Sequence, residues 1–237
     1  MDVPFFFSDE LNQKTKTLLL DEAASRHAVQ VLRMKEDEAI QLANGKGIIA
    51  RAIITDAHKK KTEVAIESIT YQPPAAHIIS IAISLVKNAA RFEWFLEKAT
   101  EIGITDIYPL LCHRTERQVF RLDRMKQILI SAMLQSQQAW MPVLHTTSSF
   151  TDSIKIFEKL EGHKMIAHCL ETDKQHLTNQ LINQSTNQLI LIGPEGDFTN
   201  EEIQLALDYH YSPVALGNTR LRTETAGMVA ATLLKMR

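Results

Sequence analysis

The sequence is short of cysteine and has no long apolar run. Its two cysteines, Cys112 and Cys169, lie far apart without the spacing of metal ligands, which favours a reducing compartment and argues against a bound metal. We expect both thiols to be buried or half-buried. No apolar run approaches the about 18 residues of a membrane-spanning helix, and Met1–Phe7 carries no basic segment. These absences predict a cytoplasmic protein with no membrane partner and no metal.

The net charge is also small, −2 over 237 residues, so the chain has no overall positive electrostatic field. A nucleic-acid partner would have to be held by a local basic patch. Hydrophobic residues make up 45% and charged residues 23% of the chain. This composition is ordinary for one large folded domain or two modest ones.

The first part of the chain, residues 3–71, has the pattern of a small domain made mostly of strands. Short apolar and β-branched runs recur, broken by Asn44-Gly45 and by Lys59–Lys61, which predicts a small β-barrel or sheet. One helix interrupts it, with Asp21 as its N-cap. The apolar stripe of this helix is expected to consist of Ala24, Ala28, Val31 and Leu32. Arg26 and Arg33 lie two turns apart on another side, next to His27, where they suit phosphate contacts, although a solvated helix face accounts for them too.

A boundary is predicted at Gln72–Ala75, because two consecutive prolines fix an extended linker and end strand pairing. After it, strands alternate with helices, beginning with a strand at Ile78–Val86 and a helix from Asn88 to Gly103. Further strands are expected at Asp106–Leu111, Val143–Leu144, Met165–Ala167, Leu189–Ile192 and Val214–Leu216. Further helices are expected at Leu122–Gln138, Thr151–Leu160 and in two closing segments. Such alternation predicts an α/β domain with a mostly parallel sheet.

One stretch, Leu189–Glu202, reads as a buried strand, a bare turn and a new helix. The apolar run stops at Gly193-Pro194, Gly196 is expected to take a positive φ, and Thr199 with Glu202 forms a capping box. Loops of this kind follow the carboxyl ends of strands in α/β sheets, where ligands usually bind. An ordinary tight turn explains the glycines equally well. No Lys-Ser or Lys-Thr pair follows, and the glycine spacing is not that of a dinucleotide fingerprint.

A second stretch, Ala215–Gly227, repeats this plan, with Thr223 as the expected helix cap. Arg222 is placed beside that helix's N-terminus, where the helix dipole disfavours a cation. Such a placement favours a functional role for Arg222, and pairing with Glu224 is the alternative. The following helix is apolar nearly all round and rich in small residues, which suits a dimer contact.

Together the two stretches resemble a known signature. Gly193–Phe198 combined with Leu216-Gly217 and Leu221–Ala226 looks like the paired motifs of the RsmE family, the ribosomal RNA uridine-N3 methyltransferases of the SPOUT class. His27–Met34 followed by Asn44–Gly47 resembles that family's N-terminal PUA-like domain. Lys87…Gly103…Pro109 resembles the first strand and helix of its catalytic domain, and Gln135-Ser136 matches a further segment.

The resemblance implies a PUA-like RNA-binding domain over residues 1–72 and a SPOUT methyltransferase domain over residues 73–237, the latter with a deep trefoil knot. It also implies S-adenosyl-L-methionine as cofactor and a homodimer that completes the site. Carried over position by position, the cofactor residues are Gly193, Pro194, Glu195, Gly196, Leu216, Gly217, Leu221, Arg222 and Thr223.

The implied reaction is methylation of uridine N3 in the 16S ribosomal RNA of the small ribosomal subunit. Arg222 is expected to stabilise charge on the uracil, and Glu195 and Glu224 are the candidate acids that take up the N3 proton. The candidate RNA contacts are Arg26, His27, Arg33, Lys87, Arg91, Lys98 and Arg114.

The sequence departs from the family pattern at three places. Asp197 stands where the family usually has a second glycine, Leu134 stands where it has an acid, and no arginine follows Gln135-Ser136. Two alternatives remain at this point: a non-catalytic RNA-binding protein that retains the fold, and an α/β enzyme whose Gly-rich loop binds another anionic ligand.

Overall fold

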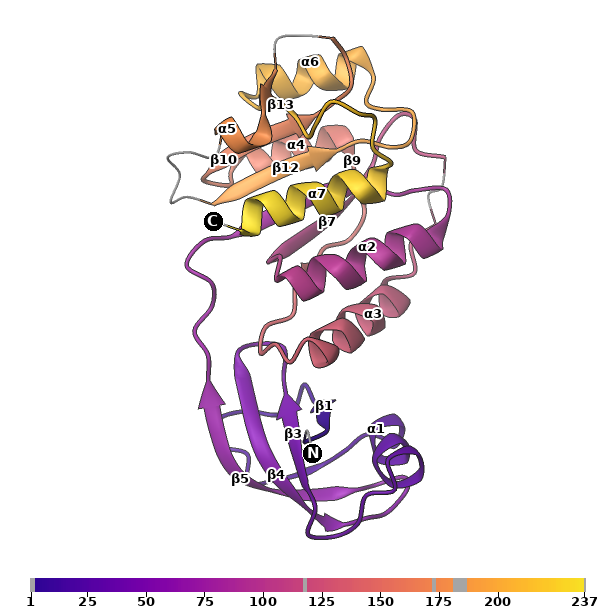
Figure 1. Cartoon of the computed structure of the whole chain (residues 1–237), viewed down its shortest axis with the longest axis vertical. Coiled ribbons are helices and arrows are strands. Elements are labelled where there is room, and N and C mark those ends of the chain that lie inside the picture. Colours follow the sequence, from indigo (N-terminus) through magenta and orange to yellow (C-terminus); the bar gives the residue numbers. More distant parts are fainter. Residues whose placement is uncertain (1–2, 117–118, 172–173, 181–186, 237) are drawn as a thin grey trace. The chain divides into compact units, whose positions relative to one another are not determined.

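The computed structural model describes residues 3–116, 119–171, 174–180 and 187–236, and the chain divides into two compact units (Figure 1). The first unit consists of two segments, the chain up to Pro74 and a later segment, Ile130–Met141. The second unit comprises Ala75–Leu129 and the chain from Pro142 onward. The sequence predicted a single boundary between residues 72 and 73 and did not indicate that Ile130–Met141 belongs to the first unit.

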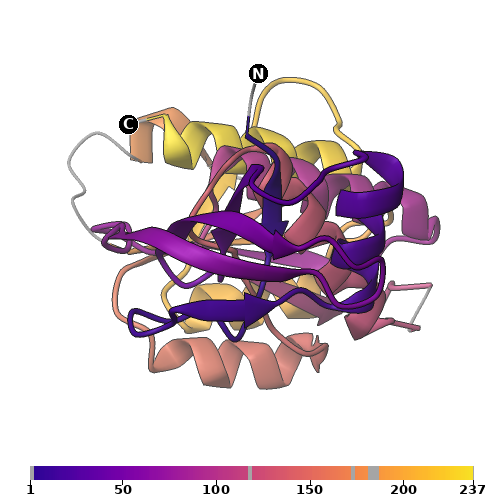
Figure 2. The same cartoon turned by 90° about the horizontal axis from the view of Figure 1, so that it is seen from below.

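The first unit is built on a mixed five-stranded sheet. Its order is β1-β3-β4-β5-β2, with β1 parallel to β3 and the other neighbours antiparallel. The strands are β1 (Phe5–Phe7), β2 (Thr17–Leu19), β3 (Ala39–Ala43), β4 (Ile48–Asp56) and β5 (Glu63–Tyr71). Seen from below, the indigo and purple strands form a curved sheet with the helical segment beside it (Figure 2). The apolar side chains of alternate strand positions form the core of this unit.

The helical segment departs from the expected 3.6-residue period. Helix α1 (Glu22–Arg26) begins as predicted, because Asp21 Oδ1 accepts the Ala24 N–H at 2.7 Å. It continues as a π-helical turn, η1 (His27–Val31), in which the Leu32 N–H reaches the His27 carbonyl at 2.9 Å. A π turn holds more residues than an α turn, so the expected stripe is wrong for Val31 and Leu32, which are 63% and 42% exposed.

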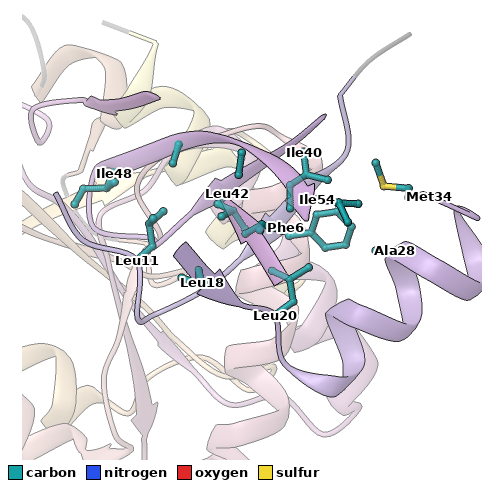
Figure 3. Close-up of a cluster of buried hydrophobic side chains, with 13 residues drawn as sticks. Phe6, Leu11, Leu18, Leu20, Ala28, Met34, Ile40, Leu42, Ile48 and Ile54 are labelled. Atoms are coloured by element: carbon teal, nitrogen blue, oxygen red, sulfur yellow. The ribbon is translucent and has the colours of Figure 1, made fainter. Parts of the chain in front are cut away.

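Met34 takes the place of those two residues against the sheet and joins Ala28, which the expected stripe included. Both are buried, and they lie across from Phe6, Ile40 and Ile54 in the core of this unit (Figure 3). Arg33 follows the π turn in a left-handed conformation, with φ 57°. It therefore does not share a helix face with Arg26, contrary to the expectation.

The second unit contains the parallel sheet that the sequence predicts. Its order is β11-β13-β10-β12-β6-β7-β8, with β9 also on β7, and all these pairs are parallel. The strands are β6 (Ile79–Ser84), β7 (Asp106–Leu111), β8 (Val143–Leu144), β9 (Ser148–Ser149), β10 (His163–Ala167), β11 (Gln175–His176), β12 (Gln188–Ile192) and β13 (Ser212–Ala215). Every residue of β6 and β12 is buried, as expected of strands covered on both faces.

Helices cover the two faces of this sheet. On one face, α2 (Ala89–Ile102) and α7 (Thr223–Lys235) lie side by side and α7 packs on β6 (Figure 1). On the other, α4 (Phe150–Glu158) and α6 (Asn200–Asp208) share an apolar cluster with the sheet. The remaining helices are α3 (Leu122–Gln135), which ends before the predicted Gln138, and α5 (Leu177–Gln180). No helix in the described ranges is long and apolar enough to cross a membrane.

Candidate active site

The candidate site lies where three neighbouring strands end. β13, β10 and β12 are adjacent and parallel, so the segments that follow them meet at one edge of the sheet. These segments are the loop at residues 168–171, which resumes at Lys174, the turn Gly193–Phe198 and the stretch Leu216–Arg222. The two motifs singled out in the sequence are therefore brought together, with the loop after β10 between them.

The turn after β12 is tight because of two different residues. A Cβ on Gly193 would lie 3.1 Å from Cδ2 of the buried Phe198 ring, so a side chain there would force this packed ring to shift. The expected positive φ at Gly196 is wrong: the left-handed residue is Asp197, with φ 64°. The chain turns one residue later than expected, where the Asp197 N–H donates to the Pro194 carbonyl at 2.9 Å.

The capping box that follows is confirmed. Thr199 Oγ1 accepts the Glu202 N–H at 3.2 Å, and Glu202 Oε2 accepts the Thr199 N–H at 2.9 Å. The other carboxylate oxygen of Glu202 accepts the His113 N–H at 2.8 Å, which ties α6 to the segment after β7.

Arg114, also after β7, holds the turn and lines the second of the two hollows described below. Its Nη1 donates to the Gly196 carbonyl at 2.6 Å and to the Phe198 carbonyl at 3.4 Å. We expected Arg114 as an RNA contact, and the structure gives it a local task that the sequence did not indicate. Glu195 is fixed as well, since its Oε1 accepts the Lys87 N–H at 3.0 Å.

In the second motif, Arg222 is the N-cap residue of α7 without a capping side-chain bond, and Thr223 is the first helical residue. The prediction of Thr223 as the cap is thus wrong by one position. The alternative that Arg222 pairs with Glu224 is also wrong, because the acid lies 3.6 Å from Arg91 Nε. Arg222 is exposed, and its guanidinium has no hydrogen-bond or ion-pair partner in the part of the chain that the structure describes.

Two adjoining hollows lie at this edge. The first, of about 280 Å³, is lined by Leu216, Gly217 and Leu221 among others, and the second, of about 350 Å³, by Gly193–Asp197 together with Leu221 and Thr223. They share Ala167, Cys169, Arg220, Leu221 and Ala226. Small-molecule sites span about 300–1,000 Å³, so a nucleoside-sized ligand fits if it extends over both. Arg222 and Glu224 line neither hollow.

Glu224 and Glu195 differ sharply as candidate acids. Glu224 is 7% exposed, and its Oε2 is buried without a hydrogen-bond partner in the described chain. Glu195 is exposed and lines the second hollow. Of the two acids, only Glu195 lines a hollow.

Sequence reasoning missed several residues that line the first hollow, among them His168, Cys169, Lys174 and Arg220. His168 is buried, and neither ring nitrogen has a hydrogen-bond partner within the described ranges. Burial and the charge of Lys174 lower the pKa of His168, and the charge of Asp197 raises it by less. Because the net shift is downward, the ring is neutral at pH 7. Cys169 is exposed, which corrects the expectation of a buried or half-buried thiol. Only His168 and Cys169 carried a signal in the sequence, namely their position directly after the predicted strand Met165–Ala167.

Most of the candidate RNA contacts carry an acidic partner. Lys87 pairs with Glu116 at 2.8 Å, which raises the pKa of its ammonium through that hydrogen bond. Hydrogen bonds to Glu101 and Glu97 likewise raise the pKa of Lys98. Arg26 pairs with Glu22 at 2.7 Å within its own helix. His27 and Arg33 are exposed in the first unit.

Comparison with known proteins decides the family. Residues 73–235 match the model of the RNA methyltransferase domain, and residues 20–67 match that of the RNA methyltransferase PUA domain. The chain belongs to this RNA methyltransferase family. The SPOUT-type α/β fold with an N-terminal PUA domain is thereby confirmed.

Relatives of this family cover nearly the whole chain. The ribosomal RNA small subunit methyltransferase E of Synechocystis is 31% identical over 221 residues, covering 90% of this chain and 71% of the relative. The crystal structure of a probable rRNA-methyltransferase from Porphyromonas gingivalis is 32% identical, with TM-score 0.89 and coverage of 98% and 97%. A ribosomal RNA small subunit methyltransferase E from Neisseria gonorrhoeae, crystallised with S-adenosyl methionine, is 28% identical, with TM-score 0.85 and the same coverage.

Proposed function

We propose that this RNA methyltransferase uses S-adenosyl-L-methionine to methylate uridine N3 in the 16S ribosomal RNA of the small ribosomal subunit. Support comes from the family membership, from relatives named ribosomal RNA small subunit methyltransferase E, and from the S-adenosyl methionine held by the gonococcal neighbour. The observation that carries the proposal is the meeting of the Gly193–Phe198 turn with Leu216–Arg222 around two adjoining hollows.

The residues at this edge suit the cofactor. Gly193, Gly196 and Gly217 bare the backbone around the hollows, where amides and carbonyls can bind a nucleoside edge without side chains in the way. Leu216, Leu221 and Ala226 supply an apolar surface for the base. When bound, the cofactor supplies an activated methyl group, and the protein must orient the uracil in line with it.

Removal of the N3 proton is the task left to the protein. N3 carries a hydrogen at neutral pH, and as it leaves, negative charge builds on the two uracil carbonyl oxygens. Arg222 stabilises that charge, because it is an exposed arginine without an acidic partner among the described residues, next to the hollows. Glu195 takes up the proton, directly or through water, since its second carboxylate oxygen accepts no hydrogen bond from the described residues. Glu224 is the second candidate acid, and it suits this role less well than Glu195 because it is buried.

The RNA must present an unpaired base, because pairing or stacking hides N3. Arg26, His27 and Arg33 in the first unit, and Lys87, Arg91, Lys98 and Arg114 in the second, are the proposed RNA contacts. Since most of these cations are locally neutralised, we expect recognition of the folded small subunit rather than strong binding to free RNA.

A homodimer completes the proposed assembly. Helix α7 buries Gly227, Ala230 and Leu234 within the chain, whereas its apolar Met228, Val229 and Leu233 are only partly covered. A second copy of this face would cover them.

The test of the catalytic role replaces Arg222 with Ala. Affinity for S-adenosyl methionine, measured by calorimetry, should stay within a few-fold, while methylation of small subunits should fall by about a hundredfold or more, the usual cost of losing a charge-stabilising group. Arg124→Ala, which removes an exposed arginine paired with Glu93, is the control and should leave both values unchanged. Unchanged turnover of the Arg222 variant would refute the role.

A further inference from the structure

Asp197 connects two walls of the site that are far apart in sequence. Its Oδ2 accepts the Cys169 N–H at 2.7 Å, and its Oδ1 accepts the N–H of its neighbour Phe198 at 2.8 Å. The first bond joins the turn after β12 to the loop after β10. No other hydrogen bond in the described ranges joins these two segments side chain to backbone.

Each segment also has its own support away from the other. Lys174 Nζ donates to the carbonyls of His168 and Leu170, at 2.7 and 2.6 Å, and so closes the loop after β10 on itself. Arg114 holds the turn through the Gly196 carbonyl. Each segment thus has contacts of its own, and beyond the paired ends of β10 and β12 the carboxylate of Asp197 bridges them.

Both segments line the hollows described above. Cys169 lines both hollows and Asp197 lines the second, so a change in their separation changes the width of the space that the ligand enters. An ionised acceptor makes a stronger hydrogen bond to a backbone amide than a neutral one does.

We propose that Asp197 is a positioning residue that fixes the width of the cofactor cleft, and so sets the affinity for S-adenosyl methionine rather than the rate of methyl transfer. This inference rests on the proposed function. Asp197 has no direct role in the methyl transfer. It acts by accepting the hydrogen bond from the Cys169 backbone N–H.

The backbone conformation of Asp197 separates this role from a merely structural one. A left-handed φ of 64° is strained for Asp and free for Gly, so Asp197→Gly removes strain while it removes the carboxylate. This relief of strain offsets part of the stability lost with the two hydrogen bonds, so the variant should melt within a few degrees of the wild type, yet bind its cofactor more weakly. A residue that only supported the fold would lose both together.

The experiment compares the wild type with Asp197→Gly and Asp197→Asn by calorimetric titration with S-adenosyl methionine. The Gly variant should bind about tenfold more weakly, in line with the loss of one charge-assisted hydrogen bond. The Asn variant keeps an oxygen acceptor and tolerates a left-handed φ, so its affinity should stay within about threefold. In methylation assays the Gly variant should show a raised KM for the cofactor with kcat within about twofold.

Asp37→Gly is the matched control. Asp37 is also left-handed, with φ 66°, and lies in the first unit, so this change relieves the same strain without touching the cleft and should leave cofactor affinity unchanged. Equal affinity of Asp197→Gly and the wild type would overturn the proposal, as would a lower kcat at saturating cofactor with an unchanged KM. Absence of binding by the wild type itself would instead refute the proposed function on which the inference depends.

Discussion

Arg114 shows how one side chain can determine the shape of a binding turn. Its guanidinium spans the Gly196 and Phe198 carbonyls, which lie 82 and 84 residues away in sequence. A Cβ on Gly196 would meet Arg114 Cδ at 3.2 Å, so the turn and the arginine are closely packed. The same residue is a proposed RNA contact, and the two roles make different predictions.

Arg114→Ala should weaken binding of S-adenosyl methionine by about tenfold, because two carbonyls lose a charged donor and the turn is freed. Arg114→Lys should recover part of the loss, since the ammonium is also a charged donor but sits on a shorter side chain than Nη1, the single nitrogen that donates to both carbonyls. Calorimetry with the cofactor alone checks this. If Arg114→Ala binds the cofactor as the wild type does but binds small subunits more weakly, the RNA role stands and the turn-holding role fails.

The two thiols make a second prediction at the residue scale. Cys169 is exposed and lines both hollows, whereas Cys112 is buried and burial raises its pKa to about 12. One equivalent of N-ethylmaleimide should therefore react at pH 7, and slowly, because burial and Asp197 also raise the pKa of Cys169. S-adenosyl methionine should slow this reaction by filling the cleft.

Mass spectrometry of the modified peptide checks the assignment, with Cys169→Ser as the control that should abolish labelling. Labelling at an undiminished rate in the presence of saturating cofactor would place the cofactor away from Cys169. Labelling of Cys112 in the folded protein would contradict its burial.

At the scale of elements, the packing of α7 depends on the absence of a side chain at Gly227. A Cβ there would lie 2.7 Å from Phe95 Cε2 and 2.8 Å from Ile83 Cδ1, so α7 approaches both α2 and β6 through this residue. Gly227→Ala gains about 1 kcal/mol of helix propensity, but the steric cost of overpacking is about 1–3 kcal/mol. We expect a net loss of unfolding free energy.

Urea denaturation measures that loss, and Ile83→Val offers the control because it removes the Cδ1 atom that the new methyl group meets. The double variant Gly227→Ala/Ile83→Val should lose less than the sum of the two single changes. Additive losses would show that the contact with Ile83 is not the source of the cost.

Elements whose formation depends on residues close in sequence could be predicted. The caps Asp21, Asn88 and Thr199 each accept a backbone N–H two or three residues ahead, so the signal lies within one turn. The strand at Asp106–Leu111 was predicted at its observed limits, and the buried strand before Gly193 to within one residue. These local patterns were sufficient to identify an α/β domain with a parallel sheet and two loops at one edge.

Features that depend on distant contacts could not be predicted. The π turn exposes Val31 and Leu32, and Met34 fills the core of the first unit in their place, which a fixed 3.6-residue period cannot show. Asp197 is left-handed and bonds to Cys169, 28 residues away, whereas the sequence pointed to the glycine beside it. The two motifs were found from the sequence and the fold brings them to one edge of the sheet, whereas the contacts that Arg114, Asp197 and Lys174 make there became visible only in three dimensions.

At the scale of the whole molecule, the second unit contains two tyrosines and a thiol, buried or half-buried, whose pKa values are raised in the folded state. Burial raises the pKa of Tyr108 to about 12 from an ordinary value of about 10, and it raises the pKa of Tyr211 too. Cys112 begins from a lower ordinary value, about 9, so it is the first of these groups to affect folding as the pH rises.

The direction of the effect follows from proton linkage. In the folded chain Cys112 keeps its proton up to about pH 12, while in the unfolded chain the thiol ionises from about pH 9. Its contribution to stability is fully present below pH 9 and is lost as the pH rises from there towards 12, at up to about 1.4 kcal/mol per pH unit.

Urea midpoints followed by circular dichroism should thus be flat to pH 9 and fall between pH 9 and 10. Cys112→Ser, which does not ionise in that range, should remove most of the fall, whereas Cys169→Ser should retain most of it. A wild type as stable at pH 10 as at pH 8 would show that the Cys112 thiol does not stay protonated in the folded chain.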